Sequence, residues 1–257
     1  LLVDALDPHE VPRVEHDDGW TYFITRLPDT DDDFNDYTTP IFFALGKEYI
    51  VTVSRDSLGR LWQPFIDNTQ VSTAQRTKMF MLMLEAITRQ YQTRVASINR
   101  QMRATTSDVR TLTSKDIITL TEYERKLNDY LDALQPTNTA VEKLLAGKLL
   151  PLYEDDRDLV EDVSIEFEQL IARCKSLLRT ITNVRDSYRA VMDTRLNETI
   201  RLLTVITLAF TAPTMIAGLY GMNVEIPGEH LPYMFWIVVV FSLAISGALG
   251  YYFLRKK

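Results

Sequence analysis

The stretch LLTVITLAFTAPTMIAGLYGMN, residues 202–223, decides the fold of this chain. Residues 202–220 carry no charged side chain, and a second uncharged stretch follows at 231–254. About 20 apolar residues in a helix are enough to cross the roughly 30 Å hydrocarbon core of a bilayer. Soluble core helices rarely stay apolar on every face for this length. The sequence therefore predicts two transmembrane helices, 202–220 and 231–254, joined by a short outer loop at 221–230.

Charge at the ends of these stretches predicts their orientation. Arg195 and Arg201 precede the first stretch, and a basic tail at 255–257 follows the second. The loop between them carries Glu225 and Glu229 and no Lys or Arg. Because cytoplasmic flanks are enriched in basic residues, we expect both termini in the cytoplasm and the protein in an inner or plasma membrane.

Composition separates a polar region from the apolar one. The chain has 28 Lys and Arg against 35 Asp and Glu, a net charge of −7, and nearly all of these residues lie in 1–201. An acidic chain without a basic, aromatic-rich patch is not expected to bind nucleic acid. A single Cys174 excludes an intrachain disulfide. There is no paired His at metal-ligand spacing, no Gly-rich phosphate loop and no nucleophile elbow, so no enzyme activity is expected. Because the sequence begins with Leu1, we expect an N-terminally trimmed fragment.

The polar region is predicted to form strands followed by helices. Strands are expected at 20–25, 40–45 and 49–54, the last two forming a hairpin around Gly46. Helices are expected at 72–104, opened by a capping box at 72–75, and at 114–134, where Pro136 interrupts and a short continuation ends at Gly147. From 152 to 212 there is neither Gly nor Pro, which predicts one helix of roughly 90 Å entering the membrane without a break.

This long helix carries an apolar seam and an acidic run. The seam recurs at gaps of four and three and must pack against helices of this chain or of other subunits. It consists of Leu170, Cys174, Leu177, Ile181, Val184, Tyr188 and Val191. The acidic run is Glu154, Asp155, Asp156, Asp158, Glu161 and Asp162, where hydrated cations or basic partners could offset the repulsion. An earlier run, Asp29 to Asp36, is expected to be a solvated loop surface.

The first predicted span has a polar face. Thr207, Thr211, Thr214 and Gly218 are spaced 4, 3 and 4 residues apart and share one side of a helix. Such a stripe is compatible with helix packing and with pore lining. Neither span contains a charged residue, which favours passive conduction over coupled transport.

The first span ends in Tyr220-Gly221-Met222-Asn223, which resembles the signature of the CorA family of magnesium channels. The topology, the acidic loop, the basic tail and the long preceding helix are similar to that family. The resemblance implies a mainly α membrane protein with a small N-terminal α/β domain, long stalk helices forming a funnel, two transmembrane helices per subunit and a homopentamer. The implied organisation is 1–70, remnant of the α/β domain; 71–148, helical arms; 149–201, stalk; 202–220, first span; 221–230, outer loop; 231–254, second span; 255–257, cytoplasmic tail.

The resemblance also implies roles for individual residues. Gly221, Met222 and Asn223 would form the selectivity filter, with Asn223 oxygens ringing the outer mouth, and Glu225 and Glu229 would concentrate cations there. The pore lining would be Asn197, Ile200, Leu203, Thr207, Thr211, Thr214 and Gly218, with Ile200 and Leu203 as the hydrophobic constriction. Asp4 and Asp162 would bind regulatory magnesium and hold the pore shut.

Magnesium is thus the expected permeant and regulatory ion. A zinc, cobalt or nickel transporter of the same family is the alternative, and a membrane-anchored helical sensor or scaffold without a pore is the more remote one. The retained Met222 and the lack of clustered His or Cys favour magnesium.

Overall fold

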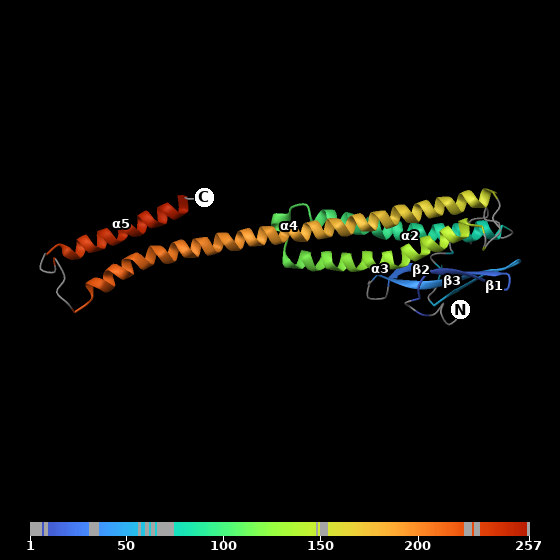
Figure 1. The fold of residues 1–257 in the computed structure, drawn as a ribbon, viewed down its shortest axis with the longest axis horizontal. Coiled ribbons are helices and arrows are strands. Elements are labelled where there is room, and N and C mark those ends of the chain that lie inside the picture. Colours follow the sequence, from blue (N-terminus) through green and yellow to red (C-terminus); the bar gives the residue numbers. More distant parts are fainter. Residues whose placement is uncertain are drawn as a thin grey trace. The chain divides into compact units, whose positions relative to one another are not determined.

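The computed structural model describes residues 7, 10–30, 36–55, 58, 59, 62, 65, 75–147, 149, 154–223, 228 and 232–255. The chain divides into two units, Leu1–Asp186 and Ser187–Lys257. The first contains a sheet and the helices packed on it, and the second contains two apolar helical stretches (Figure 1).

The first unit begins with a four-stranded antiparallel sheet in the order β1-β2-β3-β4. Its strands are β1 (Arg13–Asp17), β2 (Trp20–Thr30), β3 (Asp36–Leu45) and β4 (Ile50–Ser54). The three strands expected from the sequence are confirmed, although β2 and β3 are longer than predicted. The strand β1 was not predicted because its sequence, RVEHD, is short and mostly charged.

Two tight turns define the register of this sheet. Asp18 and Gly19, with φ of 47° and 77°, join β1 to β2, because a two-residue hairpin requires positive φ. At the other end, the Gly46 amide donates to the Tyr49 carbonyl at 2.9 Å, which confirms the expected hairpin between β3 and β4. A Cβ on Gly46 would lie 2.6 Å from the Trp20 ring, so only glycine fits against this side chain.

Helices α2 (Arg76–Thr105) and α3 (Ser114–Leu145) pack on the sheet, with the short 3-10 turn η2 (Val109–Thr111) between them. The capping box expected at 72–75 falls mostly outside the described residues, and Gln75 caps α2 without a side-chain bond. A capping box does open α3, between Thr113 and Asp116.

The interruption expected at Pro136 is wrong, because α3 continues through it. Leu134, Thr137 and Val141 are buried on both sides of the proline, and this packing offsets the lost backbone bond. The predicted end is confirmed: Gly147 has a φ of 73° just beyond the helix.

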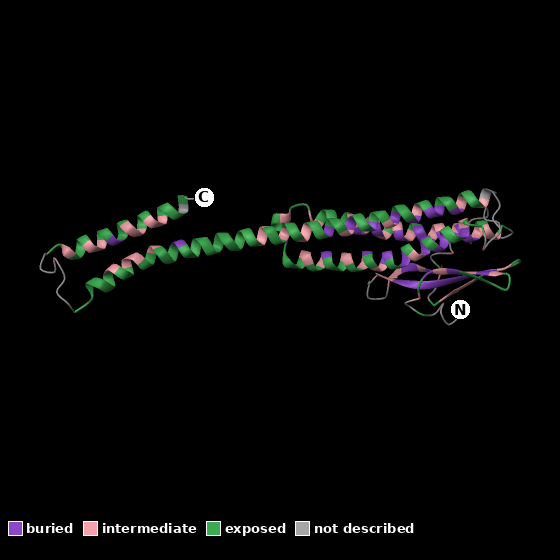
Figure 2. Ribbon diagram, viewed as in Figure 1, coloured by how far each residue is buried: buried purple, intermediate pink, exposed green. Residues whose placement is uncertain are grey.

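Helix α4 (Glu154–Tyr220) is continuous, as predicted for 152–212, and extends to the end of the first apolar stretch. The first four residues of its seam are buried in the same core as α2, α3 and one face of the sheet (Figure 2). This part of the seam therefore packs against helices of its own chain. Burial raises the pKa of the Cys174 thiol to about 12, so this residue is an unreactive part of the core.

Candidate functional site

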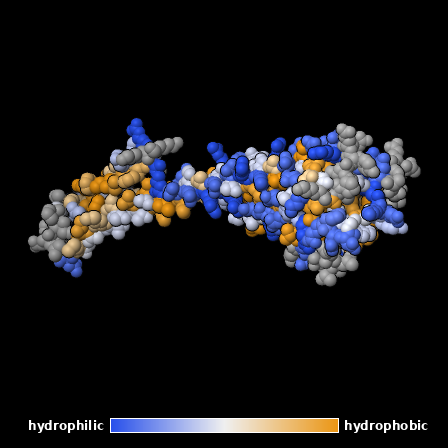
Figure 3. Space-filling model, turned by 45° about the vertical axis from the view of Figure 1, so that its right-hand side comes forward, coloured by the Kyte–Doolittle hydropathy of each residue, from blue (hydrophilic) through white to orange (hydrophobic). Residues whose placement is uncertain are grey.

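The second unit contains two helical stretches long and apolar enough to cross a membrane: the C-terminal part of α4 and the helix α5 (Met234–Arg255). Their side chains are largely exposed, with Phe210 at 72% and Trp236 at 65%. Apolar surface gathers on these two helices (Figure 3). A soluble protein rarely exposes such large apolar patches, so this surface is suited to lipid or to neighbouring subunits.

Helix α5 covers one face of the apolar part of α4. Val205 is buried there, and Ala209, Ala212 and Ile216 are half-buried. Hydrogen bonds between described residues join the helices: the Ser246 hydroxyl donates to the Ala209 carbonyl, and Arg201 Nη2 donates to the Phe253 carbonyl at 2.7 Å. The sequence did not predict either bond.

The predicted pore-lining residues occupy the opposite face of α4. At 3.6 residues per turn, their mean direction lies roughly 150° around the helix from the face that α5 covers. All of them are exposed; they are Asn197, Ile200, Leu203, Thr207, Thr211, Thr214 and Gly218. Spacing predicted a shared face for Thr207, Thr211, Thr214 and Gly218, and the family resemblance added the other three. The structure adds that α5 leaves this face free.

The threonine hydroxyls on this face all donate to their own helix. Thr207 donates to the Leu203 carbonyl, Thr211 to the Thr207 carbonyl and Thr214 to the Phe210 carbonyl, at 2.7–2.9 Å. A hydroxyl has one hydrogen and two lone pairs. Because the hydrogen is engaged, each oxygen presents only acceptor capacity to its surroundings. The stripe is therefore a row of hydrogen-bond acceptors.

The Gly221-Met222-Asn223 segment follows α4 directly and is exposed. The Gly221 amide closes the last helical turn by donating to the Ala217 carbonyl at 2.9 Å. A Cβ at Gly221 would lie 3.3 Å from that carbonyl oxygen, so glycine is favoured here by close approach. Its φ lies outside the left-handed region. Glu225 and Glu229 lie outside the described residues.

The proposed regulatory pair is only half described. Asp162 is an exposed residue of α4, whereas Asp4 lies outside the described residues. Among the residues that the structure describes, no group of three or more His, Cys, Asp or Glu is placed to hold a metal ion. Near Asp162, burial and the charges of Glu85 and Asp162 raise the pKa of Glu166. Carboxylates therefore lie close together in this part of α4, but a metal site formed by Asp4 and Asp162 stays a prediction.

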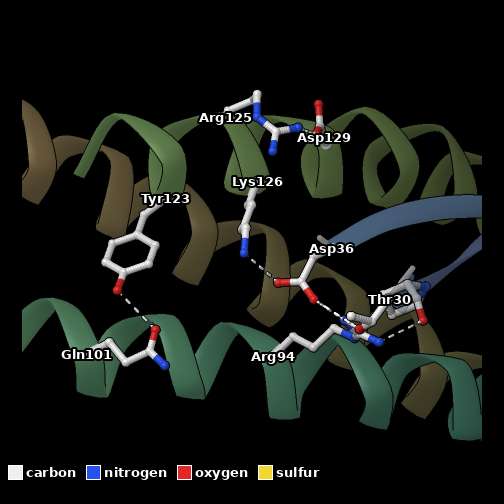
Figure 4. A network of polar contacts seen from close by, with 9 residues as sticks. Thr30, Asp36, Arg94, Gln101, Tyr123, Arg125, Lys126 and Asp129 are labelled. Carbon is white, nitrogen blue, oxygen red and sulfur yellow. Dashed lines mark hydrogen bonds and ion pairs between the residues drawn. The ribbon is translucent and has the colours of Figure 1, made fainter. Parts of the chain in front are cut away.

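The expectation that the acidic run from Asp29 to Asp36 is solvated is wrong for Asp36. Its carboxylate accepts from Arg94 Nη1 at 2.5 Å and from Lys126 Nζ at 2.9 Å (Figure 4). Arg94 also donates to Thr30 Oγ1 at 2.8 Å. Asp36 thus joins the start of β3 to both α2 and α3. The two basic partners are 58 and 90 residues away in sequence, so no local pattern could indicate them.

These features define an integral membrane protein with two C-terminal spanning helices, the first of which keeps a polar face free of its neighbour. The comparison with protein families agrees. The model of the family described as CorA-like Mg²⁺ transporter protein matches residues 1–256, so the chain belongs to that family.

Individual relatives span most of the chain. It is 26% identical over 259 residues to the cobalt/magnesium transport protein CorA of Methanocaldococcus jannaschii, covering 98% of this chain and 81% of that one. It is 21% identical to the protein of the same name from Thermotoga maritima, covering 100% of this chain and 75% of that one. The complete structure of the M. jannaschii CorA magnesium transporter superposes with a TM-score of 0.86 at 22% identity, covering 100% of this chain and 82% of that chain.

A zinc relative matches more narrowly. The zinc transport protein ZntB of Pectobacterium carotovorum is 22% identical over 115 residues, which covers 44% of this chain and 35% of that protein.

Proposed function

We propose that this chain is the subunit of a homopentameric channel that conducts magnesium ions into the cell. The observation that carries the proposal is the free face of α4, where acceptor oxygens follow one another opposite the face covered by α5. Five such faces around one axis would enclose a path lined by oxygen acceptors. The relatives named as magnesium or cobalt/magnesium transporters support the same activity.

An acceptor-lined path suits a hydrated cation. Magnesium dehydrates reluctantly and usually keeps several of its waters. Those waters point their oxygens at the ion and their hydrogens outward. Because the hydroxyl hydrogens of Thr207, Thr211 and Thr214 are already engaged, their lone pairs can accept hydrogen bonds from this outer layer. An anion would meet no free donor from these hydroxyls.

This role of the stripe is tested by removing one hydroxyl. We expect Thr207→Ala to slow magnesium uptake into proteoliposomes severalfold. Thr199→Ala is the matched control, because Thr199 also donates to its own helix, to the Arg195 carbonyl, but lies off the stripe. Equal rates in the two variants would contradict the proposed lining, and an absence of flux in the unaltered protein would favour the poreless scaffold.

At the outer mouth, the side-chain oxygens of Asn223 would bind the hydrated ion without the deep electrostatic well that a carboxylate ring would create. Gly221 and Met222 would hold the loop, and Glu225 and Glu229 would raise the local cation concentration. Asn223→Ala should abolish uptake while the pentamer still forms, as measured by its mass in detergent. Normal uptake in that variant would refute this mouth.

The cytoplasmic end of the path would be closed by Ile200 and Leu203, which are 51% and 64% exposed on the free face. Magnesium bound by Asp4 and Asp162 at a subunit interface would stabilise the closed state, provided that this state binds it better. Asp162→Asn should then raise the magnesium concentration that inhibits uptake. Asp158→Asn, an exposed neighbour on α4, is the control.

The ion itself is the point on which relatives differ. The partial similarity to ZntB favours zinc as the second candidate, with cobalt and nickel beside it. Uptake of each ion by the same proteoliposomes, with the others as competitors, distinguishes them. Magnesium at physiological concentration should outcompete the transition metals if the hydrated ion is selected.

A further inference from the structure

The contact between α5 and α4 occurs where α4 has lost a backbone hydrogen bond. Pro213 lies inside α4 and has no amide hydrogen. In an uninterrupted helix the amide of residue 213 would donate to the carbonyl of residue 209. That carbonyl, of Ala209, instead accepts the hydroxyl of Ser246. The donor that Pro213 removes is therefore supplied by the other helix.

This exchange matters because the site lies in a membrane-spanning stretch. An unsatisfied carbonyl in hydrocarbon costs several kcal/mol, since no water can replace the missing donor. Ser242, one turn earlier on α5, provides a contrast. It is buried in the same interface, but its hydroxyl donates to the Val238 carbonyl of its own helix. Of these two serines, Ser246 forms the bond between the helices.

A second bond joins the helices near the cytoplasmic end of the same stretch. Arg201 Nη2 donates to the carbonyl of Phe253, in the last turn of α5. The last carbonyls of a helix lack intrahelical donors and carry partial negative charge, so a guanidinium both satisfies and neutralises them. Arg201 lies between Ile200 and Leu203, the residues of the proposed constriction.

We propose that Ser246 and Arg201 are positioning residues for conduction, which attach α5 to the pore-lining helix at the Pro213 gap and beside the constriction. The inference rests on the proposed function and gives α5 a role within it. The two attachment points on α4 are eight residues apart, or about 12 Å. Two points define the rotation of this segment, and its rotation decides whether Ile200 and Leu203 face the pore axis.

The test is a double-mutant cycle on the full chain in proteoliposomes, with the initial rate of magnesium uptake as one readout. A single polar contact between membrane helices contributes modestly, so Ser246→Ala should change the rate about threefold. Ser242→Ala should leave it unchanged, and Ser246→Thr, which keeps the hydroxyl, should restore it. Pro213→Ala supplies an amide hydrogen to the Ala209 carbonyl, so Ser246→Ala should have little further effect in that background.

A second readout follows the bond itself and does not depend on transport. Ala209-Phe210 is the only Ala-Phe pair in the sequence, so ¹³C-carbonyl alanine with ¹⁵N-phenylalanine selects the Ala209 carbonyl in solid-state NMR. Its carbon shift should move in Ser246→Ala and stay in place in Ser242→Ala. An unmoved shift, or equal uptake by Ser246→Ala and Ser242→Ala, would overturn the inference. If the unaltered protein conducts no magnesium while the carbonyl shift still moves, the proposed function fails and the contact stands.

Discussion

Removal of the Asp36 carboxylate should lower the free energy of unfolding of the first unit by a measurable amount. Asp36→Ala removes the acceptor from Arg94 and Lys126, whose side chains are 22% and 20% exposed. Charge-assisted bonds contribute about 1.5–3 kcal/mol each when buried, and exposed pairs contribute 1 kcal/mol or less. Because these partners are partly exposed and can turn to water, we assign about 1 kcal/mol to each contact. The expected loss is therefore about 2 kcal/mol.

The single thiol provides the assay. Cys174 is fully buried in the core of the first unit, and burial raises its pKa to about 12. Alkylation of the native protein must therefore proceed through opening. At about 1.4 kcal/mol per factor of ten, Asp36→Ala should speed labelling about 30-fold. The control is Asp129→Ala, which breaks the exposed pair with Arg125 (Figure 4) and should change the rate less than threefold. Equal rates in the two variants would refute the reasoning.

Three further predictions concern the stability of the first unit. Hydrogen bonds from the Thr113 backbone and side chain lower the pKa of Asp116 below its usual 3.8. The ionised carboxylate therefore adds to the free energy of unfolding above that value, and this addition is lost as the pH falls through the lowered pKa. In Asp116→Asn, acid unfolding monitored by circular dichroism should lose this pH dependence. Gly46→Ala places a Cβ against Trp20 and should destabilise by about 1–3 kcal/mol in denaturant melts, a result that unchanged Trp fluorescence and stability would contradict. Pro136→Ala restores an amide hydrogen to α3 and should raise the melting temperature, and a lower one would show that the proline ring is needed for packing.

Local sequence patterns predicted the helices well where one residue type decides the outcome. The absence of Gly and Pro from 152 to 212 predicted a continuous helix, and α4 is continuous. Pro136 was misjudged because a proline rule considers only the lost backbone bond. The burial of Leu134 and Val141 around it is a property of the folded core, which sequence periodicity does not weigh against that loss.

The sequence predicted which residues of the candidate site share a face of the helix, but not what surrounds that face. Spacing placed Thr207, Thr211 and Thr214 together, because residues three and four apart share a side of a helix. Which face α5 covers depends on the packing of two helices, and spacing within one helix cannot decide it. The link from Ser246 to Ala209 connects residues 37 apart and becomes intelligible only when the missing amide of Pro213 is considered together with α5.

The engaged hydroxyls of α4 also bear on leakage of protons. A row of hydroxyls can relay protons only if each one turns to donate to the next. The hydroxyls of Thr207, Thr211 and Thr214 each donate to a carbonyl of their own helix, so a relay would have to break these bonds in succession. Water beside such a wall meets acceptors that cannot pass a hydrogen onward. This face of α4 therefore offers no chain of hydroxyls along which a proton could pass.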